Sequence, residues 1–349
     1  MSDQNPAPVP RPDAFGPPLL SAAIRSTPAD FIVEEIPGFT PDGQGEHLFL
    51  WVEKRGANTF WVAQQLARWA GVADHAVSWA GIKDRHAVTR QMFSVHLPKR
   101  VRPALEGLEH PDFRVLEETW HGRKLPRGAL RGNRFELLLR ELAGDPEAIN
   151  ARLEQIAARG VPNWFGEQRF GREGGNIAAA RAMFAGRRMP REKRSILLSA
   201  ARSDIFNRIL AERVRLGAWD RALPGEVFVL DGSNSVFGPE PLDDTLVARL
   251  EAQDIHPGGA LWGEGELRSQ EQVREIEEAV VAEVPDLAAG LVAARLKQER
   301  RALRLPVREL RWQWQGDDVL KLAFMLPPGC YATAVLDALG DVVNKASTA

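Results

Sequence analysis

Hydrophobic runs with strand and helix periods alternate along the chain from about Ser21. FIVEEI and HLFLWVEK predict strands, and the second is apolar on both faces, which favours a position inside a sheet. In NTFWVAQQLARWAG the apolar residues return on one helical face, Asn58 can cap the start, and Gly71 can end the helix. VSWAG then predicts a short strand, and RFELLLREL predicts another. The pattern therefore predicts strands mixed with helices.

The second half of the chain changes character after one more helix. DPEAINARLEQIAARG predicts that helix, with Asp145 as its cap and Gly160 at its end. A loop rich in Gly and Arg follows, then a helical pattern in LSAARSDIFNRILAERVRLG and a helix over about 270–283. VRELRWQWQGDDVLKLAFML predicts a strand hairpin with its turn near 316–318. If this pair rejoins the first sheet, the middle segment is an insertion.

Composition limits the class of protein. A chain of 349 residues with 44% hydrophobic residues is long enough for two domains with buried cores. The single cysteine, Cys330, allows no intrachain disulfide and no zinc site that needs two cysteines, so we expect a reducing cytoplasm. There is no run of 18 apolar residues, and residues 1–18 are polar and rich in proline. We expect neither a membrane span nor a signal peptide, and a flexible N-terminus.

Basic residues gather in three runs although the net charge is only −2. Such runs are usually solvated surface, but three of them, with Phe and Trp interleaved, favour binding to structured RNA. The first run lies within His121–Arg134, and from it we single out Arg123, Lys124, Arg127 and Arg131. The second run comprises Arg187, Arg188, Arg191, Lys193 and Arg194. The third comprises Arg295, Lys297, Arg300, Arg301 and Arg304.

Several kinds of chemistry lack their sequence patterns. The glycines of RFGREGGN fit neither GxxxxGK[ST] nor GxGxxG, so we expect no nucleotide cofactor. His75, His86 and His96 have none of the usual spacings of metal ligands, and we predict no metal site. No GxSxG elbow is present. What remains is Asp84, a lone acid between Lys83 and Arg85 in a loop after VSWAG, which taken alone could equally be a turn residue or a surface ion pair.

Three stretches resemble the tRNA pseudouridine synthase D (TruD) family as found in bacteria. GIKDRHAVTRQMFS, around Asp84, resembles the family's catalytic motif, and RGNRFELLLRE resembles its second active-site motif. VPNWFGEQRFGREGGN resembles the entry to the family's inserted domain. Weaker similarity extends the match over about residues 20–340.

The resemblance implies an α+β fold, in which a pseudouridine synthase catalytic domain has a mixed, largely antiparallel sheet with flanking helices. An inserted α/β TRUD domain interrupts it. We expect residues 19–160 and 303–349 to form the catalytic domain and 161–302 the inserted domain, after the flexible residues 1–18. The implied reaction isomerises uridine to pseudouridine in tRNA, at position 13 in bacterial members, without cofactor or metal. The implied partner is tRNA, no protein partner is implied, and we expect a monomer.

The same resemblance assigns the site residues. Asp84 is the catalytic carboxylate, acting as nucleophile or as base. Arg25 stands where the family has a lysine and holds Asp84 ionised, because burial alone would favour the neutral acid. Phe135 stacks on the target base, Phe31 is a weaker candidate for that role, and Asn133 binds the base edge or holds the Asp84 loop.

We expect Gln91 and Thr89 to order the loop around Asp84. One competing function is an RNA-binding module that has lost its chemistry, which the presence of Asp84 disfavours. The other is a different base-modifying enzyme, a methyltransferase or zinc deaminase, whose glycine fingerprint and HxE…PCxxC patterns are absent.

Overall fold

The computed structural model describes residues 11–108, 110–171, 174–233 and 235–347. They form two compact units. The large-sheet unit consists of Pro18–Leu153, Val307–Ala332 and Leu339–Ala349, and the helical unit consists of the chain up to Pro17, Glu154–Pro306 and Thr333–Ala338. The domain ranges and names given above remain a prediction.

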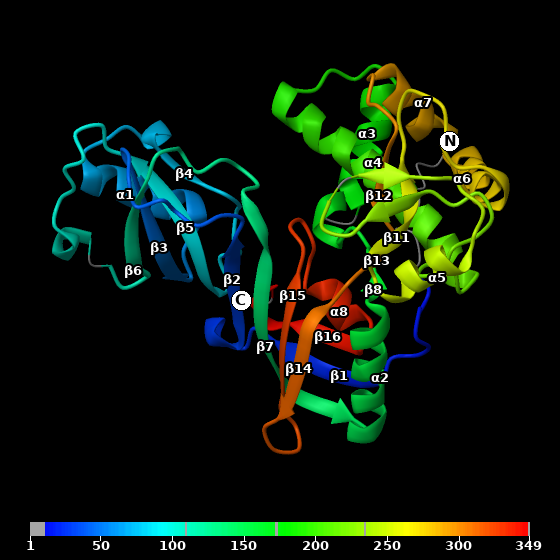
Figure 1. Ribbon diagram of the computed structural model, residues 1–349, viewed down its shortest axis with the longest axis horizontal. Coiled ribbons are helices and arrows are strands. Elements are labelled where there is room, and N and C mark those ends of the chain that lie inside the picture. The colour runs from blue at the N-terminus through cyan, green and yellow to red at the C-terminus, as the bar shows by residue number, and fades with distance from the viewer. Residues whose placement is uncertain (1–10, 109, 172–173, 234, 348–349) are drawn as a thin grey trace. The chain divides into compact units, whose positions relative to one another are not determined.

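A ten-stranded sheet organises the large-sheet unit (Figure 1). Its strands are β1 (Leu20–Ile24), β2 (Phe31–Pro37), β3 (His47–Arg55), β4 (Val77–Trp79), β5 (Val88–His96), β6 (Phe113–His121), β7 (Leu130–Gly144), β14 (Arg308–Trp314), β15 (Leu320–Leu326) and β16 (Gly340–Asn344). The main path runs β14-β15-β7-β2-β5-β3-β6, while β1 pairs with β7 and β16, and β4 pairs with β5. Only the β2/β5 and β1/β16 pairs are parallel among the described strands. The predicted mixed, largely antiparallel sheet is confirmed.

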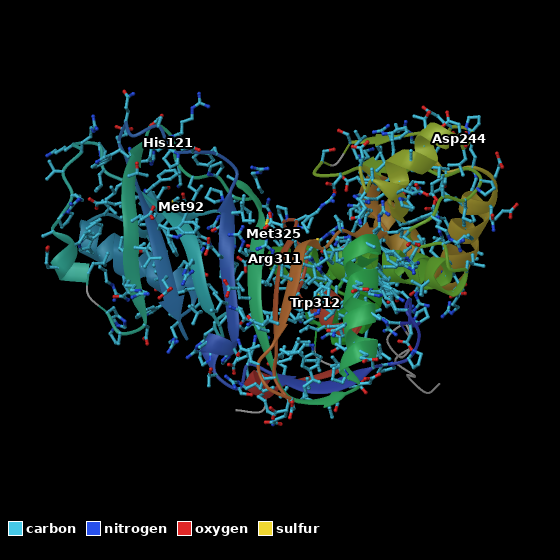
Figure 2. All side chains as sticks on the ribbon, turned by 60° about the horizontal axis from the view of Figure 1, so that its bottom comes forward. Met92, His121, Asp244, Arg311, Trp312 and Met325 are labelled. Atoms are coloured by element: carbon cyan, nitrogen blue, oxygen red, sulfur yellow. The ribbon has the colours of Figure 1, made fainter. Side chains whose placement is uncertain are left out.

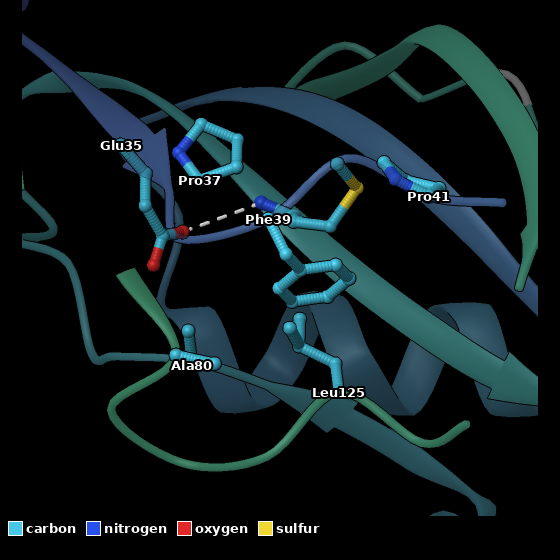
Figure 3. Close-up of a pocket in the computed structure, with 8 residues that line it drawn as sticks. Glu35, Pro37, Phe39, Pro41, Ala80 and Leu125 are labelled. Carbon is cyan, nitrogen blue, oxygen red and sulfur yellow. Dashed lines mark hydrogen bonds between the residues drawn. The ribbon is translucent and has the colours of Figure 1, made fainter. Parts of the chain in front are cut away.

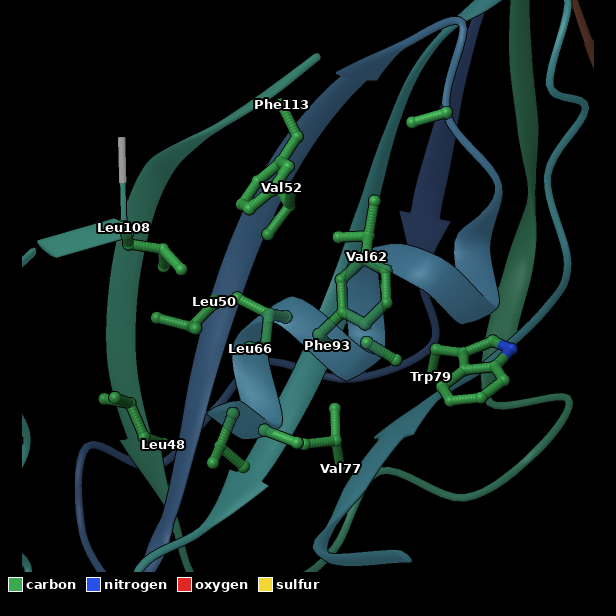
Figure 4. Packing of buried hydrophobic residues seen from close by; sticks show 14 of the residues in the cluster. Leu48, Leu50, Val52, Val62, Leu66, Val77, Trp79, Phe93, Leu108 and Phe113 are labelled. Atoms are coloured by element: carbon green, nitrogen blue, oxygen red, sulfur yellow. The ribbon is translucent and has the colours of Figure 1, made fainter. Parts of the chain in front are cut away.

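Helix α1 (Thr59–Ala70) covers one face of this sheet. The Asn58 side chain accepts a hydrogen bond from the Phe60 N–H, and Gly71 ends the helix in the left-handed region at φ 65°, both as predicted. Val62 and Leu66 are fully buried among the apolar side chains of β3 and β5 (Figure 4). Each such side chain stabilises the fold by about 1.5–3 kcal/mol, so this helix is firmly fixed behind the sheet.

The C-terminal hairpin rejoins the sheet. Strand β15 pairs with β7 along its whole length, from Leu320 opposite Leu139 to Leu326 opposite Asn133. Figure 1 shows β14 and β15 lying beside β7, and Figure 2 labels Arg311 and Trp312 on β14 and Met325 on β15. The predicted hairpin and its return to the first sheet are therefore confirmed.

The helical unit packs helices around a smaller sheet. Its elements are α3 (Gly175–Phe184), α4 (Arg191–Arg215), α5 (Asp244–Glu251), α6 (Glu271–Glu283), α7 (Pro285–Ala293) and α8 (Thr333–Asp337), with strands β8 (Val161–Pro162), β9 (Phe228–Leu230), β10 (Val236–Phe237), β11 (Ile255–Leu261), β12 (Glu299–Ala302) and β13 (Arg304–Leu305). The four-stranded sheet has the order β10-β9-β11-β12, and β13 pairs with β8. Helix α2 (Pro146–Arg159) contributes residues to both units. Helix α4 begins earlier than its hydrophobic pattern predicts, so the basic residues Arg191, Lys193 and Arg194 lie in its first turn.

Short 3₁₀ helices connect several of these elements. The 3₁₀ helices are η1 (Pro28–Asp30), η2 (Asp74–Ala76), η3 (Leu105–Leu108), η4 (Glu167–Phe170) and η6 (Lys345–Ser347). The flexibility expected of residues 1–18 falls, for residues 1–10, outside the described residues. Within the helical unit Arg11 forms an ion pair with Asp337 at 2.9 Å, and Phe15 meets Trp219 edge to face. Among the described helices none has the length and apolarity needed to cross a membrane.

Candidate active site

Asp84 lies in the loop that follows β4, as its sequence context predicted. Its Oδ2 accepts a hydrogen bond from Arg25 Nη2 at 2.6 Å, and its Oδ1 accepts one from the backbone N–H of His86 at 3.0 Å. The Asp84 side chain is nevertheless 34% exposed, whereas that of Arg25 is 9% exposed. The Arg25 guanidinium and the His86 backbone N–H thus hold one carboxylate oxygen each. The carboxylate remains partly exposed and can contact an incoming molecule.

Arg25 is held in place by its backbone and by an aromatic ring. It follows β1 directly and adopts φ 58°, a left-handed conformation that is costly for a non-glycine residue. Its guanidinium lies 3.8 Å from the centre of the Phe31 ring, close enough for a cation–π contact. Burial lowers the pKa of Arg25, and the negative charge of Asp84 opposes that shift. An arginine remains charged under these conditions, so a cation stands behind the carboxylate.

Lys54, at the end of β3, supports the loop from inside. It is fully buried, and its Nζ donates hydrogen bonds of 2.8 Å to the backbone carbonyls of Ala57 and Asp84. Burial lowers the pKa of Lys54 to about 8, although the nearby Asp84 charge acts in the opposite direction. Lys54 thereby links the backbone of the Asp84 loop to strand β3.

A second buried cation, Lys83, precedes Asp84 and pairs with Glu35 on β2. The Nζ and Oε1 atoms lie 3.5 Å apart, and Glu35 also accepts the Met92 N–H at 3.3 Å. Figure 3 shows this last bond beside the small pocket that Glu35 lines with Phe39. Burial raises the pKa of Glu35 and lowers that of Lys83, and each charge partly offsets the shift of the other. The pair anchors the start of the loop on the sheet.

Gln91 makes hydrogen bonds that order the same loop, as predicted, whereas the Thr89 hydroxyl makes none among the described residues. Gln91 Nε2 donates to the Gly81 carbonyl at 3.0 Å, and its Oε1 accepts from Thr59 Oγ1 at 3.1 Å. Thr59 Oγ1 in turn accepts the Lys83 N–H at 3.0 Å. The Thr89 hydroxyl is buried without a hydrogen-bond partner among the described residues. Thr89 therefore gives the Asp84 loop no side-chain hydrogen bond among the described residues, and its expected role in ordering that loop remains a prediction.

The remaining predicted site residues share the sheet next to this loop. Phe135 on β7 is 6% exposed, stacks on Phe324 with ring centres 5.4 Å apart, and meets Phe31 edge to face. Asn133 lies opposite Glu35 in the β2/β7 register, and its Oδ1 is buried without a hydrogen-bond partner in the described part of the chain. The stacking role of Phe135 and the base contact of Asn133 remain predictions.

The first two basic runs expose most of their cations. Arg123, Lys124, Arg127 and Arg131 are exposed on the segment that links β6 to β7 and on the start of β7. Arg127 lies over the Trp79 ring at 3.8 Å, and Lys124 donates to the His75 carbonyl. The second run is also exposed; it comprises Arg187, Arg188, Arg191, Lys193 and Arg194.

The third run was wrongly expected to hold RNA as a whole. Arg300 forms an ion pair with Glu277 at 2.7 Å, and both side chains are almost fully buried. Arg304 is 4% exposed and donates to His256 Nδ1 and to two backbone carbonyls. Both side chains are buried within the helical unit, where their charges face buried acceptors and cannot reach a phosphate on the surface.

Two buried residues of the site, Lys54 and Glu35, were missed from the sequence. In β3 the buried face is formed by Leu48, Leu50 and Val52, and Lys54 is the next residue of the same parity. In β2, Glu35 continues the buried face of Phe31 and Val33 in the same way. A charged residue at an inward-facing strand position is the signal that would have found both.

Comparisons of the sequence and of the fold with known proteins all match the same family. The family model described as tRNA pseudouridine synthase D (TruD) matches residues 18–180 and 176–339. The tRNA pseudouridine synthase D of Xanthomonas axonopodis pv. citri is 56% identical over 350 residues, with 95% of each chain covered. That of Hydrogenovibrio crunogenus is 47% identical over 331 residues, with 94% of this chain and 95% of the relative covered. The crystal structure of a putative TruD from Methanosarcina mazei shares the fold, with a TM-score of 0.73 at 22% identity and 96% of each chain covered.

Proposed function

Because this chain belongs to the tRNA pseudouridine synthase D family and is an isomerase that acts on tRNA, we propose that Asp84 is the single carboxylate that carries its reaction. The observation that supports this most is the 2.6 Å pair between Arg25 and a carboxylate that is one-third exposed. The substrate is a uridine of tRNA, with position 13 as the proposed site. The reaction uses no cofactor and no metal, and a tRNA substrate makes the cytoplasm the proposed compartment.

The reaction rearranges atoms without adding any. The bond between C1′ and N1 breaks, the uracil turns while still bound, and C5 bonds to C1′. The proton on C5 leaves, and N1 gains one. Asp84 begins this sequence either by attacking covalently or by removing a ribose proton, and both roles require an ionised carboxylate at the start.

The surrounding groups hold the Asp84 carboxylate and its loop in place. Arg25 supplies the positive charge that offsets burial of the carboxylate when a base covers it. Lys54 and His86 hold the loop backbone and the second oxygen, so the carboxylate does not need to reorganise as charge moves. These contacts hold the carboxylate in a fixed geometry, and such positioning lowers the barrier of a reaction that uses no cofactor.

Base recognition is assigned to two neighbours of this loop. Asn133 Oδ1 is a buried acceptor that a uracil N–H can satisfy. Phe135 offers an aromatic face for the flipped base, whose unstacking costs a few kcal/mol. Since Phe135 is buried in this structure, stacking requires the site to open when RNA enters.

The test is isomerisation of an unmodified tRNA transcript, with EDTA present, by the wild type, Asp84→Asn and the exposed control Asp74→Asn. Nucleoside mass spectrometry quantifies pseudouridine, and an adduct specific for pseudouridine maps its position. We expect product at position 13 with the wild type and the control, and a loss of about 10⁴-fold or more with Asp84→Asn. If the wild type binds tRNA and makes no pseudouridine, the chain is an RNA-binding module. If Asp84→Asn retains the rate, the assignment of Asp84 fails.

A further inference from the structure

Three histidines lie side by side across the sheet at the end of β3 remote from Asp84. His47 opens β3, is paired in register with His96 on β5, and is paired on its other side with His121 on β6. Directly opposite residues of paired strands point to the same face, so the three rings form one row. The rings of His47 and His96 stack with centres 4.7 Å apart. Because these histidines lie far apart in the sequence, a search for local spacings of metal ligands does not find them.

Glu46 adds a carboxylate to two of these histidines. One ligand atom from each of Glu46, His47 and His96 lies within 4.8 Å of the other two. His96 Nε2 and Glu46 Oε1 are 3.0 Å apart. Ligands at about 2.0–2.2 Å from a tetrahedral ion lie roughly 3.4 Å from each other, so the ligand atoms must approach by up to about 1.4 Å. The two stacked imidazole rings must also rotate until both lone pairs point at the ion.

The unpaired nitrogen of His47 is the second observation that favours a ligand. Its Nδ1 is buried and has no hydrogen-bond partner among the described residues. His121 differs, because its Nδ1 accepts the Asp42 N–H at 3.3 Å and lies 3.2 Å from Asp42 Oδ1. We therefore count His121 as a neighbour of the site and leave it out of the ligand set.

The loop that carries Glu46 is fixed by a close backbone contact. Gly45 has φ 88°, and a Cβ there would lie 2.4 Å from the Cα of Gly122. Only glycine fits this approach, which sets where the chain enters β3. The carbonyl of Glu46 also accepts the Leu97 N–H at 2.7 Å, directly after His96. Glu46 and His96 are thus held together by the backbone as well as by their side chains.

We propose that Glu46, His47 and His96 bind one divalent transition-metal ion of the zinc type, with water in the open position. Two imidazoles and a carboxylate suit Zn²⁺, Ni²⁺ or Co²⁺, while Mg²⁺ prefers oxygen ligands. Lys54 lies seven positions after His47 in β3, a distance of about 23 Å in a strand. The ion therefore joins the ends of β3 and β5 and takes no part in the reaction at Asp84.

The experiment titrates Zn²⁺ alone into the full chain, purified without a histidine tag, by isothermal calorimetry at one pH. Co²⁺ is then added to a second sample, and its visible absorption reports whether nitrogen ligands bind it. The variants are Glu46→Gln, His47→Gln and His96→Gln, with the exposed His75→Gln as the matched control. The Glu46 and His96 side chains are 50% and 37% exposed, so these two variants are expected to fold.

We expect one equivalent of Zn²⁺ per chain and a Kd that rises at least about tenfold in each ligand variant. His75→Gln should bind as the wild type does, and EDTA should leave the isomerisation rate unchanged. Absence of saturable binding, or binding that survives both His96→Gln and Glu46→Gln, overturns the proposal. Because the readout is metal binding, the outcome is independent of whether Asp84 carries the reaction.

Discussion

The Asp84 loop and the run from Arg295 to Arg304 both concentrate positive charge, but they use it differently. Around Asp84, the cations Arg25 and Lys54 converge on one loop whose carboxylate stays one-third exposed. In the second region, the charge of Arg300 is taken up by the buried carboxylate of Glu277. The first arrangement leaves its acid open to a substrate, whereas the Arg300–Glu277 pair leaves neither its acid nor its cation exposed.

The difference lies in the acid partner. Where the acid is also buried, as Glu277 is, the pair is satisfied within the protein and can only stabilise or specify the fold. Where the acid is partly exposed, as Asp84 is, the cation positions a carboxylate that can still contact another molecule. Charge density along the sequence does not separate these cases, but the exposure of the partner does.

The largest expected effect is a loss of stability when the Arg300–Glu277 pair is broken. Arg300→Met leaves the buried Glu277 without its cation, so the free energy of unfolding should fall by about 3–5 kcal/mol. Urea denaturation of the full chain measures this. The matched control, Lys297→Met, removes a 73% exposed lysine paired with Glu264 and should unfold as the wild type does. A loss below about 1 kcal/mol for Arg300→Met would mean that the pair is not structural.

Removing the Arg25–Asp84 pair should lower the activity and change the stability little. Arg25→Ala removes the donor behind the carboxylate, and we expect kcat/KM to fall by about 10²–10³-fold. Arg25→Lys keeps the charge but loses the planar donor, and should remain within about tenfold of the wild type. Single-turnover rates of pseudouridine formation test both. Equal losses for the two variants would contradict a charge role for Arg25.

The protonation of Lys54 predicts how the isomerisation rate depends on pH. Its folded pKa of about 8 means that the rate should fall as pH rises through 8, because the neutral amine holds the Asp84 carbonyl less firmly. The unfolded chain binds this proton more tightly between about pH 8 and the ordinary lysine pKa near 10.5. This group therefore makes the free energy of unfolding rise with pH there, so the loss of rate is not unfolding.

The matched variant is Lys54→Met, which should be about tenfold slower at pH 7 and should lack the decline near pH 8. Rates from pH 6 to 9, with circular dichroism at each pH, measure both effects. A decline near pH 8 that persists in Lys54→Met would assign it to another group.

The smallest effect concerns the exposed run before α4. Replacing Arg187, Arg188 and Arg194 by Gln removes cations that make no side-chain ion pair among the described residues. We expect KM for tRNA to rise about three- to tenfold, kcat to stay constant, and the salt dependence of KM to weaken. Arg274→Gln, an exposed arginine paired with Glu278, serves as the control. An unchanged salt dependence would remove this run from the RNA interface.

Local patterns predicted much of this fold and less of the site. The cap at Asn58, the left-handed end at Gly71 and the final hairpin follow from residue type and period, and the structure confirms them. The loop position of Asp84 follows in the same way. Lys54 was not found, because it reaches Asp84 through tertiary packing across 30 residues of chain. The fate of the third basic run depends on buried partners such as Glu277, which no local pattern identifies.

The return of the last strands to the first sheet has a consequence for synthesis. The end of β15 is made 182 residues after the end of β7, the strand it covers. At about 5–20 residues per second, the open edge of β7 waits roughly 10–35 s on the ribosome for its partner. An uncovered strand edge is a template for pairing with other chains. The nascent enzyme is therefore most prone to aggregate in the interval before its final residues emerge.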